Sequence, residues 1–326
     1  MTKVFAIICL CLLSSPVFAS GPSPAKRLPA PQQETTIQGC EKPPSQFVTV
    51  DGVRVHYLQA GAGPTVVLIH GNAGSVDDFT YKAVRLLCSD YTVVAIDRPG
   101  HGQSDRLKRK PEQLESQAAW LHDTLAALGL KHPILVGHSW GASLALAFAL
   151  HYQDDISSLI LLAPAAFAEK EENWWWMSTF VKPPVIGDVS LALGKLFFGK
   201  SMLKKELKDA FYPEPVPEDY LKSANESWLD HKHLRSYLED EWKLNDSLKT
   251  LSKRYSEIHV PVVIVTGDAD KVCLPKENAY PLKAAIGKSQ LVELKHAGHE
   301  IPQTEPESIR NALVLVTANS ARSTVS

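Results

Sequence analysis

The sequence predicts an α/β fold in which a mostly parallel central sheet is covered by helices on both faces. Six short apolar runs are continuous rather than alternating, which is typical of parallel strands that are buried on both faces. These runs are residues 65–69, 92–96, 134–136, 159–162, 262–265 and 291–294. Helical patterns lie between them, at residues 79–87, 114–128, 142–151 and 280–285. Alternation of strand and helix along the chain indicates parallel strands joined by crossover helices.

The ordered part of the chain is expected to begin with a hairpin. Two alternating runs, residues 46–50 and 53–57, flank the turn pair Asp51-Gly52. An Asp-Gly pair between alternating runs is a strong signal for an antiparallel hairpin. The first part of the core is therefore placed at residues 46–164.

The strand–helix alternation stops between residues 165 and 254. This stretch is too long for a loop, and it contains amphipathic patterns near residues 203–211 and 233–244. We interpret residues 165–254 as a helical cap inserted into the core. The second part of the core follows at residues 255–318, and residues 319–326 are predicted to be a C-terminal tail.

The first nineteen residues have the pattern of a signal peptide. A short positive start is followed by an apolar run at residues 4–13, and Val17-Phe18-Ala19 resembles a signal-peptidase site. We expect cleavage after Ala19 and export to the periplasm or the medium, with an uncleaved membrane anchor as the alternative. Residues 20–45, rich in Pro, Gln and Ser, are predicted to be a linker. No later apolar stretch is long enough to span a membrane.

Charge and cysteine content exclude several classes of function. The formal net charge of −2 argues against a nucleic-acid-binding protein, which usually has a strong basic excess. Cys40, Cys88 and Cys273 remain after the signal peptide. Their spacing does not suit a metal site, and one disulfide is possible, joining Cys40 to Cys88 or to Cys273.

Polar residues and glycines follow the predicted strands at the points where the strands end. The segments are His70-Gly71-Asn72 after residue 69, Gly137-His138-Ser139-Trp140-Gly141 after 136, Thr266-Gly267-Asp268-Ala269-Asp270 after 265, and His296-Ala297-Gly298-His299 shortly after 294. Parallel sheets place their sites at this edge. A serine hydroxyl needs a base to become a nucleophile, and the base needs an acid to orient it. Ser139, Asp270 and His299 supply these three groups in that order along the chain.

The segments IHGNAG, DRPGHGQSD, GHSWG, TGDADKV and HAGHEIP together resemble the α/β-hydrolase fold superfamily. The branch is that of esterases, non-metal haloperoxidase-like enzymes and carbon–carbon hydrolases, and the resemblance covers residues 46–318 except most of the insertion. It implies that Ser139 is the nucleophile, His299 the general base and Asp270 the orienting acid. Asp268 is the rival acid, and His296 is the rival base.

The resemblance also implies the surroundings of the nucleophile. Backbone N–H groups of Asn72 and Trp140 would form the oxyanion hole. Trp174, Trp175 and Trp176 would line an apolar substrate pocket, with packing of the cap as the alternative reading. His138 has no assigned role.

We therefore expect an exported serine hydrolase that works without a metal or an organic cofactor. Its partner would be a small-molecule ester or amide, with small to medium apolar esters cleaved through an acyl-enzyme. The alternatives are an aminopeptidase-like amide hydrolase, a carbon–carbon hydrolase, a perhydrolase, or a non-catalytic binding protein of the same shape. Serine at position 139 disfavours dehalogenases and epoxide hydrolases, which need aspartate there. No sequence feature indicates binding to a lipid surface, and the oligomeric state stays open.

Overall fold

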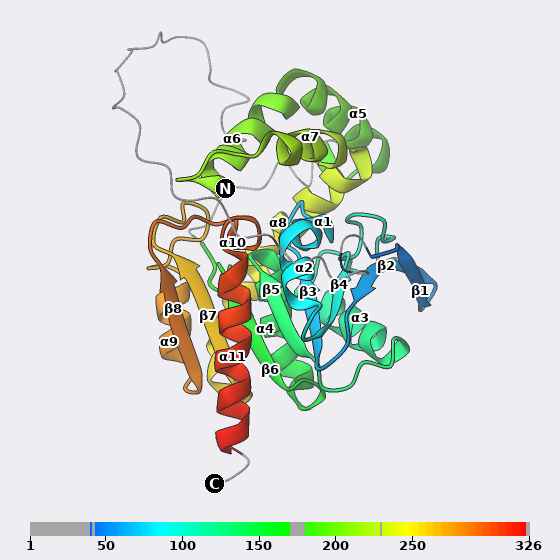
Figure 1. Ribbon diagram of the computed structural model, residues 1–326. Helices are drawn as coiled ribbons and strands as arrows, with labels where there is room; N and C mark the ends of the chain where they lie inside the picture. The colour runs from blue at the N-terminus through cyan, green and yellow to red at the C-terminus, as the bar shows by residue number, and fades with distance from the viewer. Residues whose placement is uncertain (1–39, 41–42, 170–179, 229, 324–326) are drawn as a thin grey trace, which may run out of the picture.

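The computed structural model describes residues 40, 43–169, 180–228 and 230–323 of the chain. Their centre is an eight-stranded sheet with the order β1-β2-β4-β3-β5-β6-β7-β8 (Figure 1). The hairpin of β1 (Gln46–Val50) and β2 (Val53–Ala60) is antiparallel, and β2 pairs with β4 in the same sense. All later pairings are parallel.

The six continuous apolar runs form the remaining strands, as predicted. They are β3 (Thr65–Ile69), β4 (Thr92–Ile96), β5 (Ile134–His138), β6 (Ser158–Leu162), β7 (Val262–Gly267) and β8 (Ser289–Leu294). Every residue of β5, β6 and β7 is buried. Side chains that alternate along these strands enter two separate apolar cores, one on each face of the sheet.

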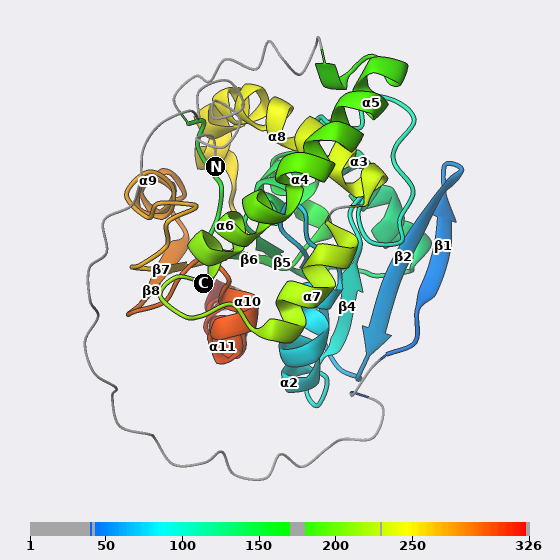
Figure 2. The same cartoon turned by 90° about the horizontal axis from the view of Figure 1, so that it is seen from above.

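Helices cover both faces, as Figure 2 shows from above. One core receives α3 (Leu114–Ala127), α4 (Trp140–Tyr152) and α9 (Ala279–Ala285). The other receives residues of α11 (Pro306–Ser323) and of the segment 77–87. One helix was predicted at residues 79–87, but a π-helical turn at Thr80–Val84 separates α1 (Asp77–Phe79) from α2 (Arg85–Leu87). Short 3₁₀ helices occur at Gln153–Asp155 and Ser252–Glu257.

The C-terminal helix α11 was not among the predicted helices, and it extends past the predicted start of the tail at residue 319. Its buried residues Ile309, Ala312, Leu313 and Val316 are spaced by three, four and seven, which is the helical signal. The short helix α10 (Ile301–Thr304) precedes it.

In the part of the chain between β6 and β7 that the structure describes, four α-helices occupy the stretch predicted to be a cap. They are α5 (Pro184–Gly194), α6 (Lys200–Phe211), α7 (Glu218–Ser227) and α8 (His231–Leu251), with a π-helical segment Lys195–Gly199 joining α5 to α6. Figure 1 shows α5, α6 and α7 above the sheet. Among the residues placed in the structure, no helix is long and apolar enough to cross a membrane.

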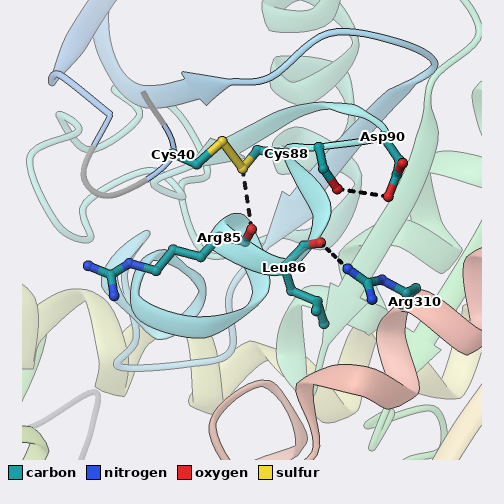
Figure 3. Close-up of a disulfide and its surroundings, with 7 residues drawn as sticks. Cys40, Arg85, Leu86, Cys88, Asp90 and Arg310 are labelled. Atoms are coloured by element: carbon teal, nitrogen blue, oxygen red, sulfur yellow. Dashed lines mark hydrogen bonds between the residues drawn. A yellow bond between two sulfur atoms is a disulfide. The ribbon is translucent and has the colours of Figure 1, made fainter. Parts of the chain in front are cut away.

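A disulfide joins Cys40 to Cys88, with a Cα–Cα distance of 6.1 Å (Figure 3). Both residues are buried, and Cys88 directly follows α2. Cys273 is a buried free thiol. Of the two pairings that the sequence left open, the structure therefore contains Cys40–Cys88, which fixes residue 40 to the core ahead of the first strand.

We expect the double variant Cys40→Ser/Cys88→Ser to unfold with a free energy about 2–4 kcal/mol lower than the parent chain, because the disulfide restricts the unfolded chain. Urea unfolding followed by circular dichroism measures this change. Dithiothreitol should destabilise the parent and Cys273→Ala but not the double variant. Equal sensitivity of all three proteins to dithiothreitol would contradict the assigned pairing.

Candidate active site

Ser139 lies at a strained turn between β5 and α4. Its backbone has φ 53° and ψ −118°, a combination that non-glycine residues rarely adopt. The flanking glycines are required by close packing. A Cβ on Gly137 would lie 2.4 Å from the carbonyl oxygen of Gly141, and a Cβ on Gly141 would lie 2.4 Å from the carbonyl oxygen of Ile69. The turn thus raises Ser139 at the end of β5, where α4 begins.

His299 and Asp270 form a buried pair. Nδ1 of His299 lies 2.9 Å from Oδ2 of Asp270. The other carboxylate oxygen, Oδ1, accepts the backbone N–H groups of Val272 and Cys273 at 2.8 and 2.9 Å. Because Nδ1–H donates to the carboxylate, Nε2 of His299 is left as the acceptor of a proton.

The rival residues lie apart from this pair. Asp268 and His296 are both exposed, and the Oδ1 atom of Asp268 accepts the backbone N–H of His296 at 2.7 Å. Asp268 also faces Lys295, at 3.7 Å. This arrangement closes a surface loop and leaves Asp270 as the carboxylate that contacts His299.

The surroundings of His299 favour its charged form. Burial by itself lowers the pKa of His299, but the charge of Asp270, the hydrogen bond to it and the charge of Glu300 outweigh that effect. The pKa of His299 therefore lies above its usual value of 6.5. A proton taken up by this imidazole is stabilised by the neighbouring carboxylates.

His138, which the sequence left without a role, connects Ser139 to His299. Its Nε2–H donates to the carbonyl oxygen of His299 at 2.9 Å, and the two rings lie 4.9 Å apart. Burial, followed by the nearby charge of His299, lowers the pKa of His138 to about 3. The ring is thus neutral at physiological pH and holds the backbone of His299 beside the turn that contains Ser139.

Cys273 is a buried residue that interacts with both Ser139 and Asp270. Burial raises the pKa of its thiol well above the usual value, and the charge of Asp270 acts in the same direction. A hydrogen bond with Ser139 opposes these effects. The backbone N–H of Cys273 donates a hydrogen bond to Asp270. Cys273 therefore contacts both Ser139 and Asp270.

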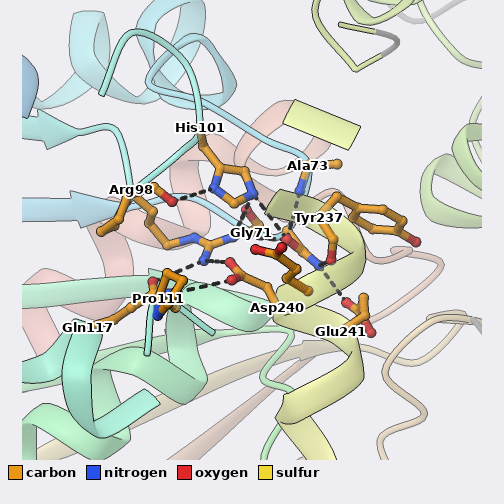
Figure 4. A network of polar contacts seen from close by, with 12 residues as sticks. Gly71, Ala73, Arg98, His101, Pro111, Gln117, Tyr237, Asp240 and Glu241 are labelled. Atoms are coloured by element: carbon orange, nitrogen blue, oxygen red, sulfur yellow. Dashed lines mark hydrogen bonds and ion pairs between the residues drawn. The ribbon is translucent and has the colours of Figure 1, made fainter. Parts of the chain in front are cut away.

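Arg98 contacts both residues that were predicted to form the oxyanion hole, and Figure 4 shows it beside Gly71 and Asp240. Its guanidinium is fully buried, donates to the carbonyl oxygen of Gly71 at 3.2 Å and to Oδ1 of Asn72 at 3.1 Å, and lies 3.9 Å from the centre of the Trp140 ring. Sequence reasoning missed this residue. The only available signal was its place directly after the aspartate that follows β4.

The charge of Arg98 is balanced by the cap. Asp240 of α8 is fully buried and accepts from Arg98 at 2.8 Å and from Arg106 at 2.6 Å. A buried charge requires such a partner, because removal from water is costly otherwise. The ion pair between Arg98 and Asp240 therefore fixes helix α8 to the core beside Trp140.

The side chain of Asn72 forms a second link to α8. Its amide nitrogen donates to Oε1 of Glu241 at 2.8 Å and to the carbonyl oxygen of Tyr237 at 3.1 Å (Figure 4). Burial raises the pKa of Glu241 to about 7, although the hydrogen bond from Asn72 opposes this shift. The main chain of Asn72 was predicted to serve the oxyanion hole, and in the structure its side chain positions the loop against the cap.

Trp174, Trp175 and Trp176, predicted to line the pocket, lie outside the described residues, as do the predicted signal peptide and most of the linker. Among the residues placed by the structure, no group of three or more His, Cys, Asp or Glu side chains is arranged to hold a metal ion.

Comparison with known proteins shows the family. The alpha/beta hydrolase fold model matches residues 64–306, so the chain belongs to this family and is a hydrolase of that fold. Three curated relatives are each 27% identical. An uncharacterised hydrolase of Bacillus subtilis aligns with 82% of this chain and 95% of its own length. A 2-hydroxy-6-oxononadienedioate/2-hydroxy-6-oxononatrienedioate hydrolase of Comamonas testosteroni aligns over 79% and 91%, and Lipase 1 of Psychrobacter immobilis over 78% and 77%.

A solved structure has the same architecture. Cfl2 of Burkholderia cenocepacia superposes with a TM-score of 0.69 at 25% identity, covering 83% of this chain and 95% of that one.

We expect Asp240→Ala to lower the free energy of unfolding by about 3–5 kcal/mol, because Arg98 would remain buried without a counter-charge. Glu239→Ala is the matched control. It removes a partly exposed carboxylate that lies 3.3 Å from Arg106, and such a pair is worth about 1 kcal/mol or less. Urea unfolding curves compare the two. Equal losses in both variants would show that the buried ion pair does not hold the cap.

Proposed function

We propose that the protein is an exported serine hydrolase that cleaves small to medium apolar carboxylic esters. The observation that supports this most directly is the strained Ser139 turn beside a buried His299–Asp270 pair. A structural serine has no need of that backbone conformation, and strain of this kind occurs where a side chain must be presented to a ligand.

In the proposed reaction, the Oγ atom of Ser139 attacks the ester carbonyl carbon while Nε2 of His299 accepts the hydroxyl proton. Asp270 keeps the imidazole in the required tautomer and stabilises the cation that forms. The carbon–oxygen bond of the ester then breaks, and the imidazolium returns the proton to the departing alcohol. A water molecule, deprotonated by His299, attacks the acyl-enzyme and releases the acid.

The backbone N–H groups of Asn72 and Trp140 would donate hydrogen bonds to the carbonyl oxygen and stabilise its negative charge. Trp140 begins α4, so its N–H points out of the helix N-terminus, where anions are favoured. Arg98 contacts the Asn72 side chain, the carbonyl of Gly71 and the ring of Trp140, and would keep the two donors in register. Donors that are already in position lower the reaction barrier, because they need no rearrangement when the negative charge develops.

Export is supported by two independent features. The apolar run at residues 4–13 has the length of a signal-peptide core, and the Cys40–Cys88 disulfide suits an oxidising compartment. Similarity to Lipase 1 supports ester hydrolysis. Similarity to the Comamonas testosteroni hydrolase supports carbon–carbon bond hydrolysis as the second candidate function. If that candidate is right, a panel of aryl and alkyl esters should show no turnover.

Ser139→Ala should lower kcat/KM for a short acyl ester at least about a thousandfold, a loss on the order of 4 kcal/mol of transition-state stabilisation. A spectrophotometric assay with p-nitrophenyl esters of graded acyl length measures the effect. Circular dichroism must show that the variant is folded. A folded variant that keeps the parent's rate would overturn the assignment of the nucleophile.

The pH profile should show neutral His299 as the active form. Protonation of this residue blocks proton uptake from Ser139, so kcat/KM falls as pH drops through its raised pKa, with a midpoint above 6.5. Asp270→Asn removes the largest influence that raises the pKa, so the acid limb should move to lower pH and activity should fall about ten-thousandfold.

Glu241 must be separated from His299 in this experiment, because its pKa of about 7 lies in the same range. Glu241→Gln is the control and should leave the acid limb in place. An acid limb that disappears in Glu241→Gln and persists in Asp270→Asn would assign the titration to Glu241 instead.

A further inference from the structure

Four large apolar side chains of the cap are exposed on the helical run that includes α5. Their exposed fractions are 55% for Val189, 51% for Leu193, 74% for Leu196 and 69% for Phe197. Spacings of four and three place Val189, Leu193 and Leu196 on one side of the helical run, and Phe197 follows Leu196 in the π-helical segment. We call these four residues the cap stripe. A soluble surface seldom groups side chains of this size unless they meet another apolar surface.

Lysines occur within the segment of the cap stripe and continue after it in the sequence. Lys195, Lys200 and Lys204 are all exposed. Between residues 195 and 209 the chain has five lysines and two acidic residues, although the whole chain has a net charge of −2. The positive charge is therefore local to the part of the cap that also exposes the apolar side chains.

The cap stripe belongs to helices that lie on the same side of the sheet as the candidate active site. Figure 1 shows α5 and α6 on the side of the sheet where α1 follows β3 and where α10 follows the loop of His299. Helix α8 of the same insertion contacts the Asn72 loop through Glu241 and Tyr237. The cap thus has one element at the site and another that exposes the cap stripe.

We propose that the cap stripe and its lysines dock the protein onto the surface of a bilayer that contains anionic phospholipids. A helix with leucine and phenylalanine on one side and lysines beside them has the composition of segments that lie in the membrane interface. The lysines supply the charge complementarity, because anionic headgroups attract them while a neutral surface does not. The esters presented to the site would be those that partition into the bilayer, and this last step rests on the proposed function.

Binding to lipid vesicles tests the proposal without any need for catalysis. The full-length chain is floated with vesicles made of phosphatidylcholine alone or of an equimolar mixture of phosphatidylcholine and phosphatidylglycerol. We expect the parent chain to partition more strongly onto the anionic vesicles. Lys200→Glu/Lys204→Glu should lower that partitioning about twentyfold or more, since each lysine near an anionic surface contributes about fivefold.

The apolar part is tested with Leu193→Glu/Leu196→Glu, which should lower the partitioning at least about tenfold. Val314→Glu is the matched control, because Val314 is a 58% exposed apolar residue on α11. It should bind vesicles as the parent does. Turnover of a soluble short-chain ester should be the same in all of these variants.

Several outcomes would overturn the docking proposal. One such outcome is that the parent does not bind vesicles. Another is that Leu193→Glu/Leu196→Glu binds as strongly as the parent, which would place the membrane contact elsewhere, for example in residues 1–19. Sedimentation of the parent as a dimer that this double variant dissociates would instead identify a contact between two copies of the chain. Vesicle binding with the expected pattern and no ester turnover would leave the docking intact and refute the proposed function.

Discussion

The backbone turn at Ser139 is the constraint on which the arrangement of the site depends. Its left-handed conformation is compatible with the sheet and with α4 only because Gly137 and Gly141 have no side chains. The same turn places His138 where it can bind the carbonyl of His299. One local distortion therefore sets the distance between two segments that are separated by 161 positions in the sequence.

A second interaction attaches the cap to this centre. The buried charge of Arg98 needs Asp240, and Asp240 belongs to the insertion. The cap therefore supplies the negative charge that neutralises a buried cation of the core, in addition to covering the core. Changes in α8 can reach the Asn72 loop through Glu241 and Tyr237, so substitutions far from Ser139 in sequence can alter the position of the loop.

The parallel sheet could be predicted from the sequence because its strands are continuous apolar runs that end in polar residues and glycine. Helix α11 was not predicted, because residues 312–316 form a continuous apolar run and only packing separates the buried Leu313 and Val316 from the exposed Val314 and Leu315. The π-helical turn at Thr80–Val84 has no local signature of this kind. Of the predicted candidate residues, Asp270 and His299 form a hydrogen-bonded pair, and His138, the neighbour of Ser139, binds the carbonyl oxygen of His299.

The contacts of Arg98, His138 and Glu241 could not be predicted, because each depends on a partner from a distant segment. The cysteine pairing was undetermined for the same reason. The exposed cap stripe is a different case. Its residues are visible in the sequence, but α5 is apolar on several sides, and only the packed structure separates the buried Leu191 from the exposed Leu193 and Leu196.

The central claim is that Ser139 is an activated nucleophile, and covalent labelling tests it most directly. The folded protein is treated with a fluorophosphonate, and the adduct is counted by intact-mass spectrometry and located by peptide mapping. The account predicts one adduct per chain, on Ser139, and none in Ser139→Ala. A folded chain that gains no adduct, or gains it on another residue, would contradict the account and favour a hydrolase-shaped binding protein.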